Sequence, residues 1–345
     1  MNTLKDSYIG NIKPSLYTDS LTRAMEEDFM EMLDKYHALA PSWDSDMDRQ
    51  IAKWYANAPD TFPKRPYFSP SSVDSCPQSL YWKHLSAPKD NFPRQPHQAR
   101  WQNAGTATGD WMQRDLLMIE KHYEKITGEF PRFVFDRTEK GEPFFEDFVK
   151  RSVPVEAKGQ KFFLHGAPDG IMFYETDEGE IVKVGIEIKS KQTTSAKTSQ
   201  FSMREAQLDH FGQTVLYSKM YDVDYYLIVY VNLSKKTWSY TEEDYEKTPD
   251  VRVFGYKFDD DLRNMYLGYL GELMDMFNKG VKPPLDINGW TFNPYKVHSV
   301  KNLTDEEIAD IVNEVEDIEK GSFPKYIKSQ ARETLNEILQ IRKLA

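Results

Sequence analysis

Residues 165–189 read HGAPDGIMFYETDEGEIVKVGIEIK. This stretch predicts two strands joined by an acidic, glycine-containing turn around residues 177–180. Side chains at positions i and i+2 of a strand share a face, so Glu187 and Lys189 project together. If the strands pair as a hairpin, Asp169 at the start of the first strand lies close to Glu187. Two carboxylates and an ammonium then share one patch, which suits a divalent metal ion with a lysine beside the water that the ion activates.

A competing interpretation is chance, because 29% of the residues are charged and Glu156-Ala157-Lys158 repeats the same Glu-x-Lys spacing. The spacing alone therefore does not establish a metal site. The two copies differ in their surroundings. Glu187 and its lysine end an alternating apolar strand, where charges are costly unless they are paired or bind a ligand. Lys158 precedes Gly159, a sequence that predicts a turn in which the lysine is solvated.

Composition limits the possible classes of protein. The 345 residues are 39% hydrophobic and 14% aromatic, enough to build a large core and to exclude disorder of the whole chain. A net charge of −11 argues against a protein that coats nucleic acid through bulk charge. It does not exclude a nuclease, which needs only a local basic groove beside an acidic metal site.

The cysteine content and the first residues indicate the compartment. The single cysteine, Cys76, excludes an internal disulfide and an iron–sulfur cluster held by four cysteines of this chain, and we expect a small buried core residue there. The start of the sequence shows no apolar signal segment, and no run reaches the length of a membrane span. We therefore expect a soluble, cytoplasmic protein without membrane contact.

Periodicity predicts helices around the central stretch. The expected helices are 20–36, 45–56, one within 67–86 capped by Ser69 or Ser71, one within 101–126 that follows Gly105 and Gly109, 201–222, 259–279 and two from Thr304 onward. Strands are expected near 133–135, 153–155 and 161–164, and the continuous apolar run 225–231 predicts a buried strand at the centre of a mixed sheet. Glu120 and His122, in a charged helix, are expected to be solvated. We expect three parts: a helical arm (1–65), a core (66–280), and a loop with a helical extension (281–345).

A polar, basic segment follows Lys189. Residues 191–200, KQTTSAKTSQ, show no apolar periodicity and predict a loop. One interpretation is an ordinary solvated loop. The other is a loop that contacts phosphates at the mouth of the acidic site.

These features together resemble a known family. Pro168-Asp169 and Glu187-Ile188-Lys189, on a helix, three strands, a helix and a strand, resemble the PD-(D/E)xK nuclease superfamily. Gln213-Thr-Val-Leu-Tyr217 is similar to the Gln-x-x-x-Tyr motif of its RecB-like exonuclease branch, which includes CRISPR-associated and phage recombination exonucleases. The segments SPSS (69–72) and CPQSLY (76–81) look like that branch's amino-terminal helix. The resemblance covers roughly residues 66–235 and implies an α/β, restriction-endonuclease-like core (αβββαβ), a mixed sheet flanked by helices, with helical extensions at both ends.

The resemblance also implies roles for single residues. Asp169, Glu187 and the carbonyl of Ile188 would bind Mg²⁺ or Mn²⁺, and Lys189 would position the attacking water or stabilise the negative charge that builds on the phosphate. Gln213 would hold the lysine or the DNA backbone, with support from Tyr217.

Two departures from the family pattern stand out. The chain lacks the cysteines of an iron–sulfur cluster, so none is expected. Gln113 stands where many members carry a metal-binding histidine, and an amide is the poorer ligand for Mn²⁺.

The resemblance implies a metal-dependent DNA nuclease, in the first place an exonuclease in recombination, repair or phage DNA processing. An endonuclease, an RNA-cutting enzyme and a nuclease-like binding module with weak or lost catalysis stay open. DNA is the expected partner, with a recombination or replication protein and self-association as further possibilities.

Overall fold

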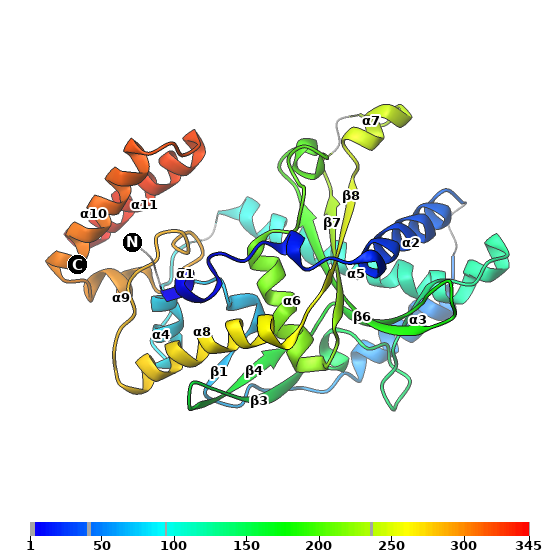
Figure 1. Cartoon of the computed structure of the whole chain (residues 1–345), viewed down its shortest axis with the longest axis horizontal. Helices are drawn as coiled ribbons and strands as arrows, with labels where there is room; N and C mark the ends of the chain where they lie inside the picture. Colours follow the sequence, from blue (N-terminus) through cyan, green and yellow to red (C-terminus); the bar gives the residue numbers. More distant parts are fainter. Residues whose placement is uncertain (1–3, 40–42, 94, 235–236, 345) are drawn as a thin grey trace.

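The predicted hairpin lies at the centre of the molecule (Figure 1). Its first strand, β5 (Gly170–Glu175), pairs antiparallel with β6 (Ile181–Lys191), and the register sets Gly170 opposite Ile186. β6 therefore extends several residues past the beginning of β5. The backbone groups of this overhang face no partner strand on the β5 side, and the acidic site forms at this step. The computed structural model describes residues 4–39, 43–93, 95–234 and 237–344.

The hairpin belongs to a five-stranded mixed sheet in the order β2-β5-β6-β7-β8. Its other strands are β2 (Phe133–Phe135), β7 (Tyr225–Asn232) and β8 (Val251–Lys257). Only the β6–β7 pair is parallel; the other pairs are antiparallel. Seven of the eight residues of β7 are buried, which confirms the central strand predicted from its continuous apolar sequence.

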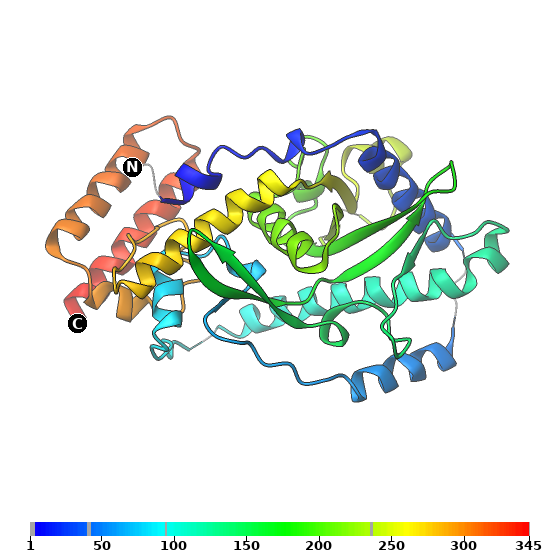
Figure 2. The same ribbon diagram turned by 60° about the horizontal axis from the view of Figure 1, so that its bottom comes forward.

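Helices cover both faces of this sheet. On one face, α5 (Pro96–Thr127) brings Gly105 against Ser190 of β6, and α2 (Ser20–His37) packs on β8. On the other face, α6 (Leu208–Tyr221) reaches Glu187, and α8 (Asp260–Asn278) packs on α6. Figure 2 shows α5 running along the molecule on one side of the strands and α8 on the other. The fold is thus α/β, with a mixed sheet between helices, as expected.

A second sheet combines β3 and β4, which lie between β2 and β5 in sequence, with β1 from an earlier part of the chain. It has the order β1-β4-β3, with β1 (Tyr67–Phe68) parallel to β4 (Gln160–Gly166) and β3 (Arg151–Ala157) antiparallel to β4. Lys158 and Gly159 form the turn between β3 and β4, both with positive φ (52° and 72°). The second Glu-x-Lys sequence therefore ends in a hairpin turn, as its glycine predicted.

The helices near the end of the chain surround a hydrophobic cluster of their own. They are α9 (Lys296–Lys301), α10 (Asp305–Lys320) and α11 (Lys325–Leu344). Cys76 is buried in this cluster beside Trp290. Thr304 caps α10 with the predicted capping box. The expected division into three parts stays a prediction.

Several predicted helix starts are wrong. The helix near residue 77 is α4 (Pro77–His84), with Pro77 in its first turn and Cys76, rather than a serine, at the N-cap. Gly105 and Gly109 lie inside α5 instead of preceding it, because Pro96 starts that helix earlier. α6 begins at Leu208, seven residues later than predicted.

The remaining elements are short, apart from α3. They are α1 (Leu4–Ile9), α3 (Ser45–Ala56), α7 (Glu242–Lys247) and the 3-10 turns η1 (Pro14–Leu16), η2 (Pro70–Ser72), η3 (Glu146–Phe148) and η4 (Ser195–Thr198). None of the helices in the described ranges combines the length and the apolar character that crossing a bilayer requires.

Candidate active site

Asp169 occupies the step at which β6 extends past β5. It directly precedes β5, and its Oδ2 accepts a hydrogen bond of 2.7 Å from the amide of Ile188. The strand register carries Asp169 to the position opposite Glu187. The hairpin therefore brings the two predicted carboxylates together. The carboxylate of Asp169 also binds a backbone donor that would otherwise lack a partner strand.

Glu187, Lys189 and Gln213 form a closed triangle of contacts. Oε1 of Glu187 lies 2.7 Å from Nζ of Lys189 and accepts a hydrogen bond of 2.7 Å from Nε2 of Gln213. Lys189 donates to Oε1 of Gln213 at 3.0 Å. Glu187 is 1% exposed, so its contacts with Lys189 and Gln213 form in a largely dry environment. Hydrogen bonds are electrostatically stronger in such surroundings than in water.

Tyr217 follows one turn later on the same face of α6. Its hydroxyl approaches Gly166, where an added Cβ would lie 3.1 Å from that oxygen. Burial, followed by the negative charges of Glu187 and Asp169, raises the pKa of Tyr217, so the phenol stays protonated. Asp169 and the five residues predicted from β6 and α6 thus lie in one cluster; the five are Glu187, Ile188, Lys189, Gln213 and Tyr217.

Gln113 reaches the same cluster from the opposite helix layer. It is 2% exposed, and its Nε2 donates a hydrogen bond of 2.8 Å to the carbonyl of Asp169. Its Oε1 is buried and has no hydrogen-bond partner among the described residues, and the same holds for Oε2 of Glu187. Buried acceptors without a donor are unfavourable. Two such oxygens beside the carboxylate of Asp169 make a set of hard oxygen donors that fits a divalent cation.

Carboxylates alone do not complete this set. Within the described ranges, no group of three or more His, Cys, Asp or Glu side chains is arranged to hold a metal ion. A cation here would need the amide oxygen of Gln113 and backbone oxygens beside Asp169 and Glu187. The residues fit such an ion because oxygen-only coordination is what Mg²⁺ prefers, although Mg²⁺ usually keeps several waters as well.

The charges of the cluster are unbalanced. Burial, and then the charge of Glu187, raises the pKa of Asp169. Burial also raises the pKa of Glu187, against the opposing effect of Lys189. Burial lowers the pKa of Lys189, but the two carboxylates outweigh it and leave that pKa raised. When both acids are ionised, one ammonium faces two carboxylates, and this electrostatic environment favours an additional cation.

Sequence reasoning missed Glu146, which borders the cluster. Its amide donates to the carbonyl of Pro168 at 3.0 Å, and its Oε2 accepts a hydrogen bond of 2.9 Å from the hydroxyl of Tyr55. Burial and the charge of Asp169 raise its pKa. Its φ of 45° is unusual for a residue other than glycine. No local pattern marks Glu146, because β3 and β4 separate it from Asp169 in sequence.

Other predictions about polar side chains near the site are wrong. Glu120 and His122 were expected to be solvated. Instead, Glu120 accepts a hydrogen bond from the amide of Phe135 at 3.3 Å and pairs with Arg137. His122 lies 2.8 Å from Oδ2 of Asp44. Both side chains connect α5 to elements distant in sequence, which periodicity cannot reveal.

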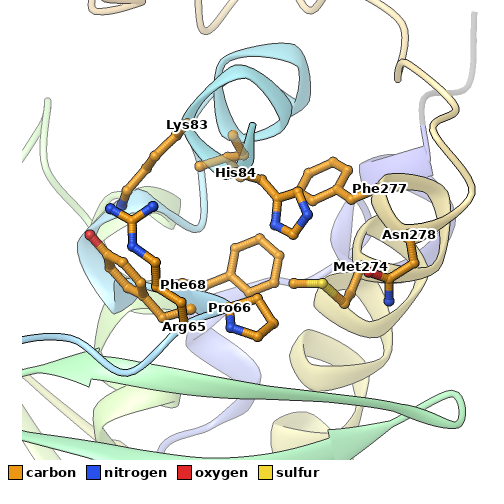
Figure 3. A pocket seen from close by; sticks show the side chains of 10 residues that line it. Arg65, Pro66, Phe68, Lys83, His84, Met274, Phe277 and Asn278 are labelled. Atoms are coloured by element: carbon orange, nitrogen blue, oxygen red, sulfur yellow. The ribbon is translucent and has the colours of Figure 1, made fainter. Parts of the chain in front are cut away.

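A cavity of about 330 Å³ lies away from these acids, between β1, α4 and α8 (Figure 3). Phe68, Phe277 and Met274 form its apolar walls, and the basic side chains of Arg65 and Lys83 lie at one side. It includes none of the predicted site residues. The acidic cluster, rather than this cavity, is therefore the candidate active site.

Comparisons with known proteins assign no function to the chain. No protein-family model matches the chain, and no curated protein matches it. Among solved structures, it is similar to one titled SSO0001, with 12% identity, a TM-score of 0.40 and coverage of 75% of this chain and 95% of that one.

Two further similar structures are exonucleases by their titles. They are an alkaline exonuclease from Laribacter hongkongensis (14% identity, TM-score 0.33, 66% of this chain and 95% of that one) and a phage-related exonuclease from Haemophilus somnus 129PT (12%, 0.32, 61% and 81%). Likenesses this distant carry no weight in assigning an activity.

Proposed function

We propose that the chain is a metal-dependent DNA nuclease of the PD-(D/E)xK type that hydrolyses phosphodiester bonds from DNA ends, in recombination, repair or phage DNA processing. One observation carries the proposal. Glu187 is 1% exposed, with one carboxylate oxygen bound by Lys189 and Gln213 and the other without a hydrogen-bond partner among the described residues, beside the half-buried acid Asp169. A purely structural ion pair would not need the second acid or the unpaired oxygen.

The ligands of Mg²⁺ or Mn²⁺ in this proposal are Asp169, Glu187, the carbonyl of Ile188 and Oε1 of Gln113. The amide of Ile188 points past the beginning of β5 toward Asp169. Because the N–H and C=O of one strand residue face the same neighbour, the carbonyl of Ile188 is directed to the same side. A bound divalent ion would polarise the phosphate and lower the pKa of its water.

The side chains have separate tasks in this mechanism. Lys189 stays protonated because of its two acidic neighbours, and its ammonium stabilises the negative charge that develops on the phosphate. Gln213 donates to Glu187 and accepts from Lys189, so it fixes the orientation of both. Tyr217 supports Gln213 from the next turn of α6, where its side chain is buried at 6% exposure.

A test of the activity uses Lys189→Met with Lys158→Met as the matched control. Both lysines belong to a Glu-x-Lys sequence, but Lys158 lies in the β3–β4 turn. We expect the wild type and Lys158→Met to cleave end-labelled DNA with Mg²⁺ or Mn²⁺, and Lys189→Met to be slower by a factor of about 10² or more. Equal cleavage by all three proteins would refute the assignment.

The substrates in that assay separate the remaining alternatives. Linear and circular DNAs, single- and double-stranded and labelled at either end, are digested in parallel, with an RNA of the same sequence. Degradation of linear molecules alone supports an exonuclease, whereas cutting of circles identifies an endonuclease. Metal binding without turnover on any substrate would instead favour the binding module.

A further inference from the structure

A groove begins where β6 leaves the acidic cluster. It has a volume of about 800 Å³, and we call it the Trp101 groove after the indole of α5 that lines it. Ser190 and Lys191, which directly follow Lys189, line it as well. Lys191 is two residues past Lys189 in the same strand, so the two side chains leave the strand on the same face. Their Cα atoms are roughly 7 Å apart along the strand. The groove therefore begins at the residue of β6 that directly follows Lys189 of the acidic cluster.

Aromatic side chains from opposite ends of the chain meet at this groove. Trp101 comes from the first turns of α5 and is 56% exposed, and Tyr326 comes from α11 and is 70% exposed. Large aromatic surfaces exposed beside a charged groove are characteristic of sites that stack unpaired bases. The helical extension at the end of the chain thus contributes a wall to a groove that starts at the candidate active site.

The indole is held in place before any ligand arrives. Nε2 of Gln192 donates to the carbonyl of Trp101 at 3.0 Å and to Oγ of Ser190 at 3.2 Å. The ring of His97 packs edge-on against the indole at 4.8 Å between centroids. The start of α5 is thereby fixed to the end of β6, so stacking on Trp101 requires little additional ordering.

The groove is locally basic on a chain of net charge −11. Lys191 and Lys197 line it, and neither belongs to an ion pair within the described part of the chain. Lys191 donates to Oε1 of Gln207 at 2.6 Å and lies 5.0 Å from the ring centre of Tyr230. The one acidic residue in the lining, Glu205, accepts a hydrogen bond of 3.1 Å from the amide of Ser15. Two ammonium groups with no paired carboxylate favour an anionic occupant.

We propose that the Trp101 groove binds a short unpaired segment of a DNA strand, with bases stacked on Trp101 and Tyr326 and phosphates at Lys191 and Lys197. The segment leads the strand to the acidic cluster, so the inference names the substrate form of the proposed nuclease and rests on that function. Duplex DNA does not fit this arrangement, because base pairing and stacking hide the faces of the bases from both rings.

Binding without catalysis tests the groove independently of the activity. The affinities of the full chain for a fluorescein-labelled oligo(dT) and for a blunt duplex are measured by anisotropy in EDTA. We expect Trp101→Ala and Tyr326→Ala each to weaken oligo(dT) binding by about tenfold and duplex binding by less than about twofold. Trp43→Ala is the matched control, since that indole is 88% exposed and does not line the groove.

The outcomes distinguish the groove from the nuclease activity. Unchanged oligo(dT) binding in both variants, or equal losses of affinity for oligo(dT) and duplex, would overturn the proposed binding in the Trp101 groove even if the chain cleaves DNA. A loss of affinity for oligo(dT) but not for duplex supports the proposed binding even if no DNA is cleaved. Tighter binding of oligo(rU) than of oligo(dT) would overturn DNA as the occupant. Unchanged circular dichroism of each variant confirms that the chain is folded.

The lysines give a second measurement. Lys197→Met should reduce the slope of log K against log[salt] for oligo(dT) by roughly 0.7, the contribution of one phosphate contact to a single strand. Lys140→Met, which alters an exposed lysine outside the groove, should leave the slope unchanged. Equal slopes in wild type and Lys197→Met would remove Lys197 from the proposed site.

Discussion

The side-chain amide of Gln213 on α6 and the carboxylate of Glu187 on β6 are joined by a hydrogen bond of 2.7 Å across 26 residues of sequence. The same amide accepts a hydrogen bond from Lys189 through its oxygen. An amide can do both at once because it carries a donor and an acceptor on one rigid group. Gln213 therefore couples the orientation of the acid to that of the lysine.

Replacing Gln213 by Leu should slow DNA cleavage by about 10- to 100-fold, because Lys189 and Glu187 keep their direct contact but lose their common anchor. The free energy of unfolding should fall by only about 1 kcal/mol, the value of a typical hydrogen bond. Initial cleavage rates and urea titrations give the two quantities. Gln340→Leu, at an exposed position of α11, is the control and should change neither. A Gln213→Leu enzyme at the wild-type rate would remove the anchoring role.

Replacing Asp169 by Asn should stabilise the metal-free protein or leave it unchanged, because it removes one of two buried like charges while an amide oxygen can still accept from Ile188. The wild type should gain melting temperature with Mg²⁺ or Mn²⁺, and the variant should gain little. Differential scanning fluorimetry in EDTA and with each metal measures both effects. Asp177→Asn, in the exposed β5–β6 turn, should keep the response to metal. A full response in Asp169→Asn would contradict its assignment as a ligand.

Replacing Gly185 by Ala should destabilise the fold by at least about 2 kcal/mol, because the added Cβ would lie 2.1 Å from Cζ of Tyr226. The ring of Tyr226 lies directly over this glycine of β6. Gly109→Ala should instead raise the free energy of unfolding by up to about 1 kcal/mol, because alanine favours a helix more than glycine does. Nothing lies within 4 Å of the position that its Cβ would take in α5. Urea unfolding of both variants tests the pair. Similar stability of the two variants would show that Tyr226 does not occupy the space above Gly185.

His210 should make folding sensitive to acid. Burial, followed by the charges of Lys189 and Lys191, lowers its pKa to about 2, whereas an unfolded histidine titrates near 6.5. Below pH 6.5 the unfolded chain therefore binds a proton that the folded chain does not, and stability is lost as the pH falls toward 2. Between pH 7.5 and pH 5.0 this loss is about 2 kcal/mol.

His210→Gln should lack that component of the pH dependence. Urea unfolding at several pH values compares the two proteins, and the difference in stability between them should shift in favour of the variant as the pH falls. The hydroxyl of Tyr230, which lies 2.9 Å from Nδ1 of His210, can still pair with an amide, so the comparison is not dominated by a lost hydrogen bond. Parallel pH profiles would show that His210 titrates normally in the folded chain.

Much of the central architecture follows from local sequence. Alternation in residues 182–188 and the acidic turn predicted the β5–β6 hairpin, and the continuous apolar sequence of residues 225–231 predicted a buried strand. Helix starts were less predictable. Residues 201–207 carry no strong stop signal, and only contacts such as the bond from the amide of Gln207 to the hydroxyl of Tyr230 keep them outside α6.

Local sequence is enough to predict which residues share one strand face and one helix face, because side-chain periodicity is a local property of the backbone. It therefore predicted that Glu187 lies beside Lys189 and that Gln213 and Tyr217 lie together. Tertiary packing sets Glu146 beside Asp169 and brings Tyr326 and Trp101 to the lining of one groove. It also leaves Gln113 and Glu187 each with a buried oxygen that has no hydrogen-bond partner among the described residues. These relations join segments far apart in the chain, and packing of the helices on the sheet, rather than any local pattern, sets them.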